Sequence, residues 1–147
     1  MTQPTTQGDT PIAQFFREFE RRASDRDGAA QAEQFADSFL AAGPQGAQCV
    51  RASDFALALP KRKELFEKLG CRRTTLASLE ETRLDERYLL VRTRWCMEFG
   101  QTGGQSKEFL VGSVFIIDTG APEFKIVLYL ANQDILTELK VHGIGTA

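Results

Sequence analysis

The pattern of apolar positions divides the chain into an N-terminal half of helices and a C-terminal half of strands. Near the N-terminus, Ile12, Phe15, Phe16 and Phe19 fall at positions i, i+3, i+4 and i+7. This spacing places them on one face of a helix. Pro11 suits the first position of that helix, because its missing N–H has no helical partner there. The residues before it are polar, and we expect residues 1–10 to be a disordered leader.

A second helix is predicted to begin near Asp27 and to end at the turn formed by residues 43–46. Its proposed apolar positions are Ala32, Phe35, Ala36, Phe39 and Leu40.

A short strand, a turn and a third helix are predicted between the second helix and the sheet. The strand covers residues 48–51, and Ser53 and Asp54 form the turn. The helix covers residues 59–69, with Pro60 in its first turn and Gly70 as its stop. A short terminal helix is expected over residues 132–141.

Residues 73–131 are expected to form four long strands whose alternation can be followed from one to the next. If each turn reverses the chain without a slip, three of these strands direct the same phase toward one core face. That phase contains Leu89, Val91, Thr93, Trp95, Met97 and Phe99, then Phe109, Val111, Ser113, Phe115 and Ile117, and finally Phe124, Ile126, Leu128 and Leu130.

The opposite phase is unusually apolar for a face in contact with water. A contiguous apolar patch usually marks association, so we expect a homodimer through this face; coverage by the terminal helix of the same chain is the alternative. The residues expected at the dimer interface are Leu90, Arg92, Val114, Ile116, Val127 and Tyr129.

The order of these elements resembles the nuclear transport factor 2-like superfamily, in particular its SnoaL-like branch. The segment of residues 27–39 is similar to the second helix of that branch, residues 60–70 to its next helix, and Phe124-Lys125-Ile126-Val127 to its last-strand pattern. The resemblance covers roughly residues 11–132. It implies a single cystatin-like α+β domain over residues 11–147, in which N-terminal helices pack in the concave face of a curved, mainly antiparallel sheet.

Members of this superfamily include isomerases, dehydratases, cyclases and association modules, so the fold does not determine the activity. Many relatives have a histidine shortly after the last-strand pattern, where this chain has Leu128, Tyr129 and Leu130. The only histidine of the chain is His142, near the C-terminus. We expect it to pack in the tail or at the surface.

Two carboxylates are candidates for a general base. With an even-numbered loop after the first long strand, Glu80 would point into the cone, where loss of water would raise its pKa. With an odd-numbered loop, Ala77 and Leu79 face inward and Glu80 is solvated. Asp54, near the short strand, is either a turn or helix-cap residue or a group at the mouth of the cone.

The core face offers a lining for a small apolar ligand, although the same residues could form a filled core. Thr93, Trp95 and Ser113 provide a few polar groups among apolar neighbours, a composition typical of ligand pockets. The expected lining is Phe15, Phe19, Phe35, Phe39, Thr93, Trp95, Met97, Ser113, Phe115 and Leu128.

Composition and charge argue against several classes of function. The chain has 18 basic and 20 acidic residues and a formal net charge of −2, so nucleic acid is not an expected partner. No apolar run is long enough for a membrane span. The three cysteines are widely spaced and have no metal-ligand pattern. We expect a cytoplasmic protein with no metal and no cofactor.

Two functions remain open from the sequence. The first is a dimeric domain that binds a small apolar ligand in the cone or serves as an association module. The second is an enzyme of the isomerase, cyclase or dehydratase type, with a buried carboxylate as general base on a small carbonyl or polycyclic substrate.

Overall fold

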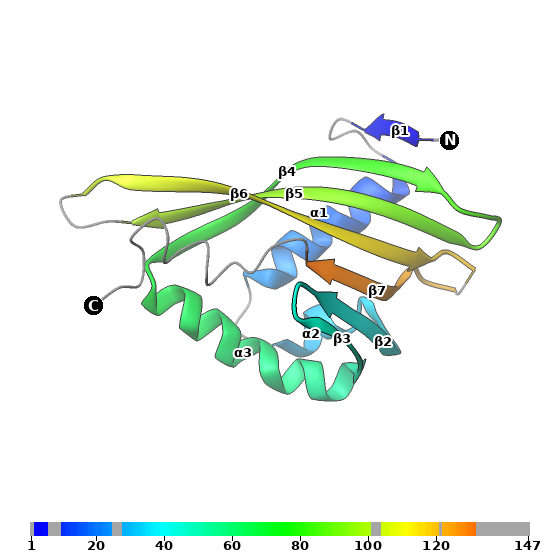
Figure 1. Ribbon diagram of the computed structural model, residues 1–147, viewed down its shortest axis with the longest axis horizontal. Coiled ribbons are helices and arrows are strands. Elements are labelled where there is room, and N and C mark those ends of the chain that lie inside the picture. The colour runs from blue at the N-terminus through cyan, green and yellow to red at the C-terminus, as the bar shows by residue number, and fades with distance from the viewer. Residues whose placement is uncertain (1, 6–9, 25–27, 101–103, 121, 132–147) are drawn as a thin grey trace.

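The computed structural model describes residues 2–5, 10–24, 28–100, 104–120 and 122–131, with backbone only for residues 2–5. The helices and strands are shown in Figure 1. The helices are α1 (Pro11–Ala23), α2 (Gly28–Ala32) and α3 (Ala52–Lys68), and the strands are β1 (Thr2–Thr5), β2 (Phe35–Gly43), β3 (Gly46–Arg51), β4 (Cys71–Arg83), β5 (Tyr88–Gly100), β6 (Ser106–Asp118) and β7 (Lys125–Ala131).

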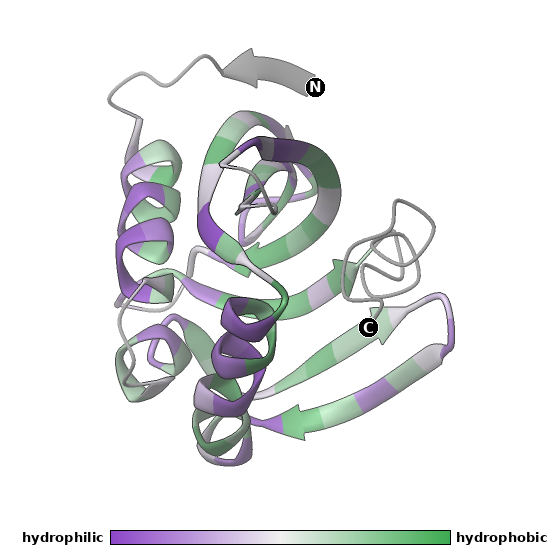
Figure 2. Ribbon diagram, turned by 90° about the vertical axis from the view of Figure 1, so that its left-hand side faces the viewer, coloured by the Kyte–Doolittle hydropathy of each residue, from purple (hydrophilic) through white to green (hydrophobic). Residues whose placement is uncertain are grey.

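The strands form one seven-stranded sheet in the order β1-β4-β5-β6-β7-β2-β3. Every neighbouring pair is antiparallel except β2 and β7, which are parallel. The sheet curves around α1, whose hydrophobic residues face the strands and whose hydrophilic residues face outward (Figure 2). Ile12 and Phe16 of α1 join the main core cluster with residues of β4, β5 and β6. The predicted α+β architecture is confirmed.

The predicted alternation is confirmed in β5 and β6. The inner phase of β5 is buried from Leu89 to Phe99, whereas Arg92 and Arg94 of the other phase are exposed. Thr93 lies opposite Ser113. Residues paired directly in an antiparallel sheet point to the same face, so the inner phase of β5 continues into β6 as expected.

The predicted alternation fails in β7 because of a β-bulge. Ile117 lies opposite Ile126, but Ile116 lies opposite Leu128, which leaves Val127 as the extra residue. Beyond the bulge the phase is inverted, and Tyr129 lies opposite Phe115 on the inner face. The prediction that Leu128 and Leu130 face inward and Tyr129 outward was therefore wrong.

The second helix is much shorter than predicted. Only Gly28–Ala32 is helical, and Phe35–Gly43 forms β2 between β7 and β3. Phe35 and Phe39 are nevertheless buried, at 3% and 2% exposed. Residues four positions apart share one face of a strand as well as of a helix, so Phe35 and Phe39 reach the same core from β2. Strand pairing on both sides overrides the local helical pattern.

The third helix begins earlier than predicted, at Ala52, so the proposed turn at Ser53 and Asp54 is its first turn. Pro60 lies inside the helix and provides no N–H for the carbonyl of Ala56. α2 packs closely at this point, since a Cβ added to Gly28 would lie 2.6 Å from that carbonyl oxygen.

The predictions for the N-terminal end of the chain can be compared with the structure, whereas those for the C-terminal end cannot. Residues 2–5, expected in a disordered leader, form β1 alongside β4. The predicted terminal helix and His142 lie outside the described residues. None of the helices in the described part of the chain has the length and apolar character required to span a membrane.

Candidate functional site

A cavity of about 360 Å³ lies between α1, α3 and the concave face of the sheet. Its walls are mainly apolar and aromatic, and they come from α1, α2 and α3 and from the strands β2, β4, β5, β6 and β7. The apolar lining consists of Phe19, Phe35, Phe55, Leu59, Phe66, Trp95, Met97, Val111, Phe115 and Tyr129.

Phe19 holds together the aromatic wall of the cavity. Its ring centroid lies 5.7 Å from that of Trp95, 5.6 Å from that of Phe115 and 6.1 Å from that of Phe35. Phe115 in turn stacks on Tyr129 at 5.1 Å. Offset and edge contacts at these distances stabilise aromatic pairs, so the wall is built from rings that fix one another.

A short chain of hydrogen bonds lies behind this wall. The Nε1 of Trp95 donates to the Oγ1 of Thr93 at 2.8 Å. The Thr93 hydroxyl donates to the backbone carbonyl of Ser113 at 3.1 Å, and the two hydroxyl oxygens are 3.0 Å apart. Trp95 and Ser113 line the cavity, whereas Thr93 supports them from the core.

The structure brings six of the ten expected lining residues to the cavity: Phe19, Phe35, Trp95, Met97, Ser113 and Phe115. Phe39 and Thr93 are buried beside it, and Phe15 packs against the same core without lining the cavity. Leu128 lies on the opposite face because of the bulge.

The sequence interpretation missed Tyr129, Phe55 and Phe66. Tyr129 was hidden by the bulge, and no sequence signal in β7 locates an extra residue there. Phe55 lay between the predicted turn at Ser53 and Asp54 and the predicted third helix, and was assigned to neither. Phe66 lies within that predicted helix, which was not connected to the cavity.

Both predicted catalytic carboxylates lie away from the cavity. Glu80 is paired with Arg92 on the outer face, since the register that places Leu79 opposite Thr93 is the one observed. Leu79 is 5% exposed. A bulge between Leu76 and Ser78 turns Leu76 inward and leaves Ala77 exposed. The inward position considered for Glu80 was therefore wrong.

Asp54 is exposed in the first turn of α3 and is absent from the cavity lining. A carboxylate there stabilises the helix N-terminus by its interaction with the macrodipole.

Other charged residues border the cavity. Glu20 of α1 lines the cavity and accepts a hydrogen bond from the backbone N–H of Leu76. From α3, the guanidinium of Arg62 lies 5.2 Å from the ring centre of Phe66, and both residues line the cavity. Glu67 and Lys63 also contribute to the lining.

Cys71 is the cysteine that lines the cavity. Burial raises the pKa of its thiol, an effect that hydrogen bonding to Thr74 partly offsets. A protonated thiol is a poor nucleophile and metal ligand. Within the described ranges, no group of three or more His, Cys, Asp or Glu residues is placed to hold a metal ion.

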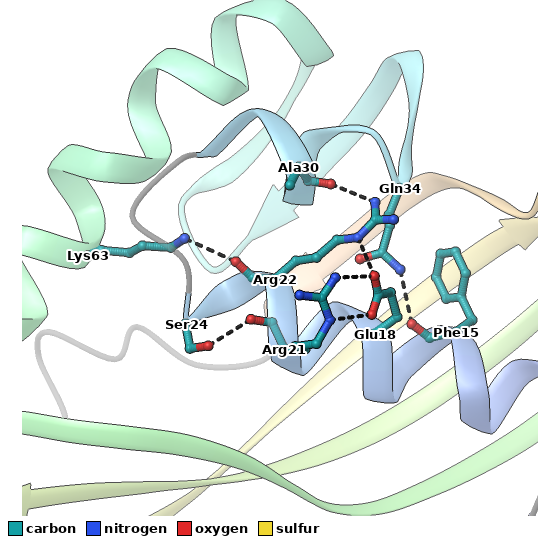
Figure 3. A network of polar contacts seen from close by, with 8 residues as sticks. All are labelled: Phe15, Glu18, Arg21, Arg22, Ser24, Ala30, Gln34 and Lys63. Carbon is teal, nitrogen blue, oxygen red and sulfur yellow. Dashed lines mark hydrogen bonds and ion pairs between the residues drawn. The ribbon is translucent and has the colours of Figure 1, made fainter.

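A polar network connects the helices beside the cavity (Figure 3). Arg22 donates to Glu18 at 2.9 Å and to the carbonyl of Ala30 at 2.7 Å, which joins α1 to α2. Lys63 of α3 reaches the carbonyl of Arg22 at 3.4 Å. The side-chain amide of Gln34 donates to the carbonyl of Phe15 at 3.0 Å. These contacts fix the ends of the helices that border the cavity.

This network predicts an unusually acidic carboxyl group. Hydrogen bonds from Arg21 and then Arg22 lower the pKa of Glu18 from 4.5 to about 2. Because the pKa is lower in the folded chain, the stability this group contributes is fully present above pH 4.5. It is lost as the pH falls from 4.5 through about 2. We expect an NMR titration of the Glu18 carboxyl carbon to show the low midpoint, and Arg21→Ala to raise it. A midpoint near 4.5 in the unsubstituted protein would contradict the network.

Comparison with known proteins finds similar structures but no similar sequences. The sequence matches no protein-family model and no curated protein. Solved structures are similar. An NTF2-like protein with a cystatin-like fold from Novosphingobium aromaticivorans has a TM-score of 0.67 and 12% identity, over 84% of this chain and 79% of that one.

Two further similar structures have described roles. The beta subunit of benzoate 1,2-dioxygenase from Burkholderia mallei has a TM-score of 0.65 and 15% identity, over 90% of this chain and 95% of that one. The association domain of CaMKII from C. elegans has a TM-score of 0.63 and 12% identity, over 83% and 92%. With its helices in the concave face of a curved sheet, the chain has the NTF2-like, cystatin-like fold that its sequence resembles.

Proposed function

We propose that this protein binds a small, largely apolar aromatic molecule in the cavity of the concave face. The observation that carries the proposal is the cavity of about 360 Å³ with walls of aromatic side chains. Ligand pockets in proteins have volumes of roughly 300–1,000 Å³ and mainly apolar walls with a few polar groups. Gln31 and Ser113 are the buried, uncharged polar side chains of this lining, and both can form hydrogen bonds.

The volume suggests the size of the ligand. A dry apolar cavity of about 150 Å³ is large enough for benzene. The cavity here is more than twice as large, which suits two or three fused rings. Flat rings can also stack against Phe115, Trp95 or Tyr129 at little conformational cost.

Binding is supported better than catalysis. The enzyme alternative required a carboxylate inside the cone, and neither Glu80 nor Asp54 lies there. The carboxylate of Glu20 is near the cavity but already accepts the Leu76 N–H. We therefore assign no catalytic residue.

The experiment is a titration with naphthalene followed by NMR. The chain has one tryptophan, so Trp95 gives a single indole N–H signal from the cavity wall. We expect this signal to shift in a saturable way as naphthalene is added. Absence of a saturable shift, together with no heat of binding by calorimetry, would refute the proposed function.

Neighbouring residues of β6 provide a matched pair of variants. Val111 lines the cavity, whereas Leu110 is 53% exposed and lies opposite Cys96 on the outer face. Val111→Phe should fill the cavity and weaken naphthalene binding by about tenfold or more, while Leu110→Phe should leave it unchanged. Equal effects of the two substitutions would place the ligand elsewhere.

We also propose that two copies of the chain associate through the outer face of the sheet. The bulge changes the residues of this surface: Leu128 and Leu130 lie opposite Ile116 and Val114 on the outer face, and Tyr129 lies on the inner face. Leu110 and Leu40 extend it and are 53% and 39% exposed.

Charge supports a second copy as the occupant. Glu80 and Arg92 lie side by side on this face, so each copy offers both signs of charge. A two-fold interface places the same patch of each chain against the other, and such a patch must complement itself. The similarity to an association domain points in the same direction.

Sedimentation tests the association. We expect the protein to sediment as a dimer and Leu110→Glu to raise the dimer dissociation constant by about tenfold or more, because it places a charge in an apolar interface. Leu57→Glu is the control, since Leu57 lies on α3 and is 74% exposed. A monomer at high protein concentration would refute the dimer.

A further inference from the structure

One buried polar atom of the cavity lining is unsatisfied. Gln31, on α2, lines the cavity and is only 6% exposed. Its side-chain oxygen Oε1 is buried and has no hydrogen-bond partner among the described residues. Leaving a buried acceptor unpaired costs about 1–3 kcal/mol, so this oxygen, carried by a residue of the cavity lining, would gain from a donor that the described residues do not supply.

The hydroxyl of Ser113 has the same unused capacity. Thr93 has one hydroxyl proton, which it donates to the backbone carbonyl of Ser113. The contact of 3.0 Å between the two hydroxyl oxygens must therefore be donated by Ser113. Thr93 then accepts from both Ser113 and Trp95, which uses both of its lone pairs.

The hydroxyl of Ser113 therefore has limited capacity for further hydrogen bonds. Its proton is committed to Thr93, so its oxygen can act only as an acceptor toward a ligand in the cavity that Ser113 lines. The N–H of Trp95 is also committed to Thr93. The protons of Thr93, Ser113 and Trp95 are thus all committed, and Ser113 can offer an acceptor. The side-chain amide of Gln31 and the hydroxyl of Tyr129 are groups of the lining that can also donate.

We propose that the ligand is a small aromatic or polycyclic molecule with a hydrogen-bond donor, a hydroxyl or N–H group, which Gln31 or Ser113 accepts. This inference rests on the proposed function and narrows it to a chemical class. A site built to accept a ligand proton discriminates strongly against an analogue without that proton, because the buried acceptor is then left unpaired.

Three probes of similar size separate the possibilities: naphthalene, 2-naphthol and 2-methoxynaphthalene. The last keeps the oxygen of 2-naphthol but has no proton to donate. We expect calorimetry to give 2-naphthol a dissociation constant about tenfold or more below that of 2-methoxynaphthalene. In Gln31→Met and Ser113→Ala, the variant that removes the acceptor used by the ligand should bring the dissociation constants of 2-naphthol and 2-methoxynaphthalene closer together.

Each outcome is decisive. Binding of all three probes with equal dissociation constants for 2-naphthol and 2-methoxynaphthalene would overturn the inference and leave the proposed function standing. Tighter binding of the methoxy compound would also overturn it, because the cavity would then supply the proton. Failure of all three probes to bind would refute the proposed function itself. A preference for 2-naphthol that both variants retain would show that neither acceptor is responsible.

Thermal unfolding of the ligand-free variants separates recognition from a structural role. Gln31→Met replaces an unsatisfied buried acceptor with an apolar side chain of similar length, so we expect its melting temperature to equal or exceed that of the wild type. A large decrease would show that Gln31 holds the fold together, and the probe series would then rest on Ser113→Ala.

Discussion

Replacing Phe16 with alanine is expected to lower the free energy of unfolding by about 3–5 kcal/mol, as for other fully buried phenylalanines. Phe16 is 0% exposed, and its ring lies 5.0 Å from that of Phe115 and 5.2 Å from that of Phe15. It is the contact through which α1 fills the concave face. The substitution removes this apolar surface and leaves a cavity that the surrounding rings cannot close.

Denaturant unfolding of Phe16→Ala measures this loss directly. Leu57→Ala is the control, because Leu57 is 74% exposed on α3, and its effect should stay within about 0.5 kcal/mol. Similar values for the two variants would show that α1 does not pack in the sheet as described.

The second large effect is expected from Thr93→Val, which keeps the shape of the side chain and removes its hydroxyl. Thr93 is 2% exposed and its oxygen contacts the Nε1 of Trp95 and both the hydroxyl and the carbonyl of Ser113. A buried polar group left without a partner costs about 1–3 kcal/mol. We expect a total loss above that of Ser113→Ala, which breaks only one of these contacts.

Hydrogen exchange at the indole N–H of Trp95 adds a local measure of the same prediction. The exchange should be faster in Thr93→Val than in Ser113→Ala, because only the first removes the acceptor of that proton. Unchanged exchange and unchanged unfolding free energy in Thr93→Val would mean that the hydrogen-bond chain contributes little.

The alternation of β5 and β6 could be predicted from sequence because period-two burial is a local property of each strand. Thr93 and Ser113 were placed together in this way, and the structure pairs them. The same reasoning failed in β7, where one extra residue at Val127 inverts every later side chain. A bulge depends on pairing between strands, and the sequence of one strand does not reveal it.

The predicted second and third helices were partly wrong, because local sequence patterns did not determine the structure of those segments. The spacing of Phe35 and Phe39 suits a helix, but β3 and β7 provide strand partners on both sides, and the segment becomes β2. Pro60 suggested a helix start, whereas α3 continues through it. Phe55 was absent from the predicted lining because the helix was expected to begin only at residue 59, whereas α3 begins at Ala52.

The candidate site was predictable only in part, for a related reason. Residues contributed by β5 and β6 were identified because their face could be deduced. The role of Glu80 depended on whether a loop had an even or odd number of residues, and the observed register places it beside Arg92 on the outer face. Gln31 carries no sequence signal, because its importance lies in a buried oxygen without a partner.

The proposal that a ligand binds in the cavity of the concave face can be tested directly with bound naphthalene. Intermolecular nuclear Overhauser effects identify the face of the sheet on which the ligand lies. Trp95, Met97 and Tyr129 line the cavity, whereas Leu128 lies on the opposite side of the sheet. We expect nuclear Overhauser effects from naphthalene protons to Trp95, Met97 and Tyr129. Effects to Leu128 and Leu110 instead, with none to Trp95, would show that the ligand does not bind in the cavity.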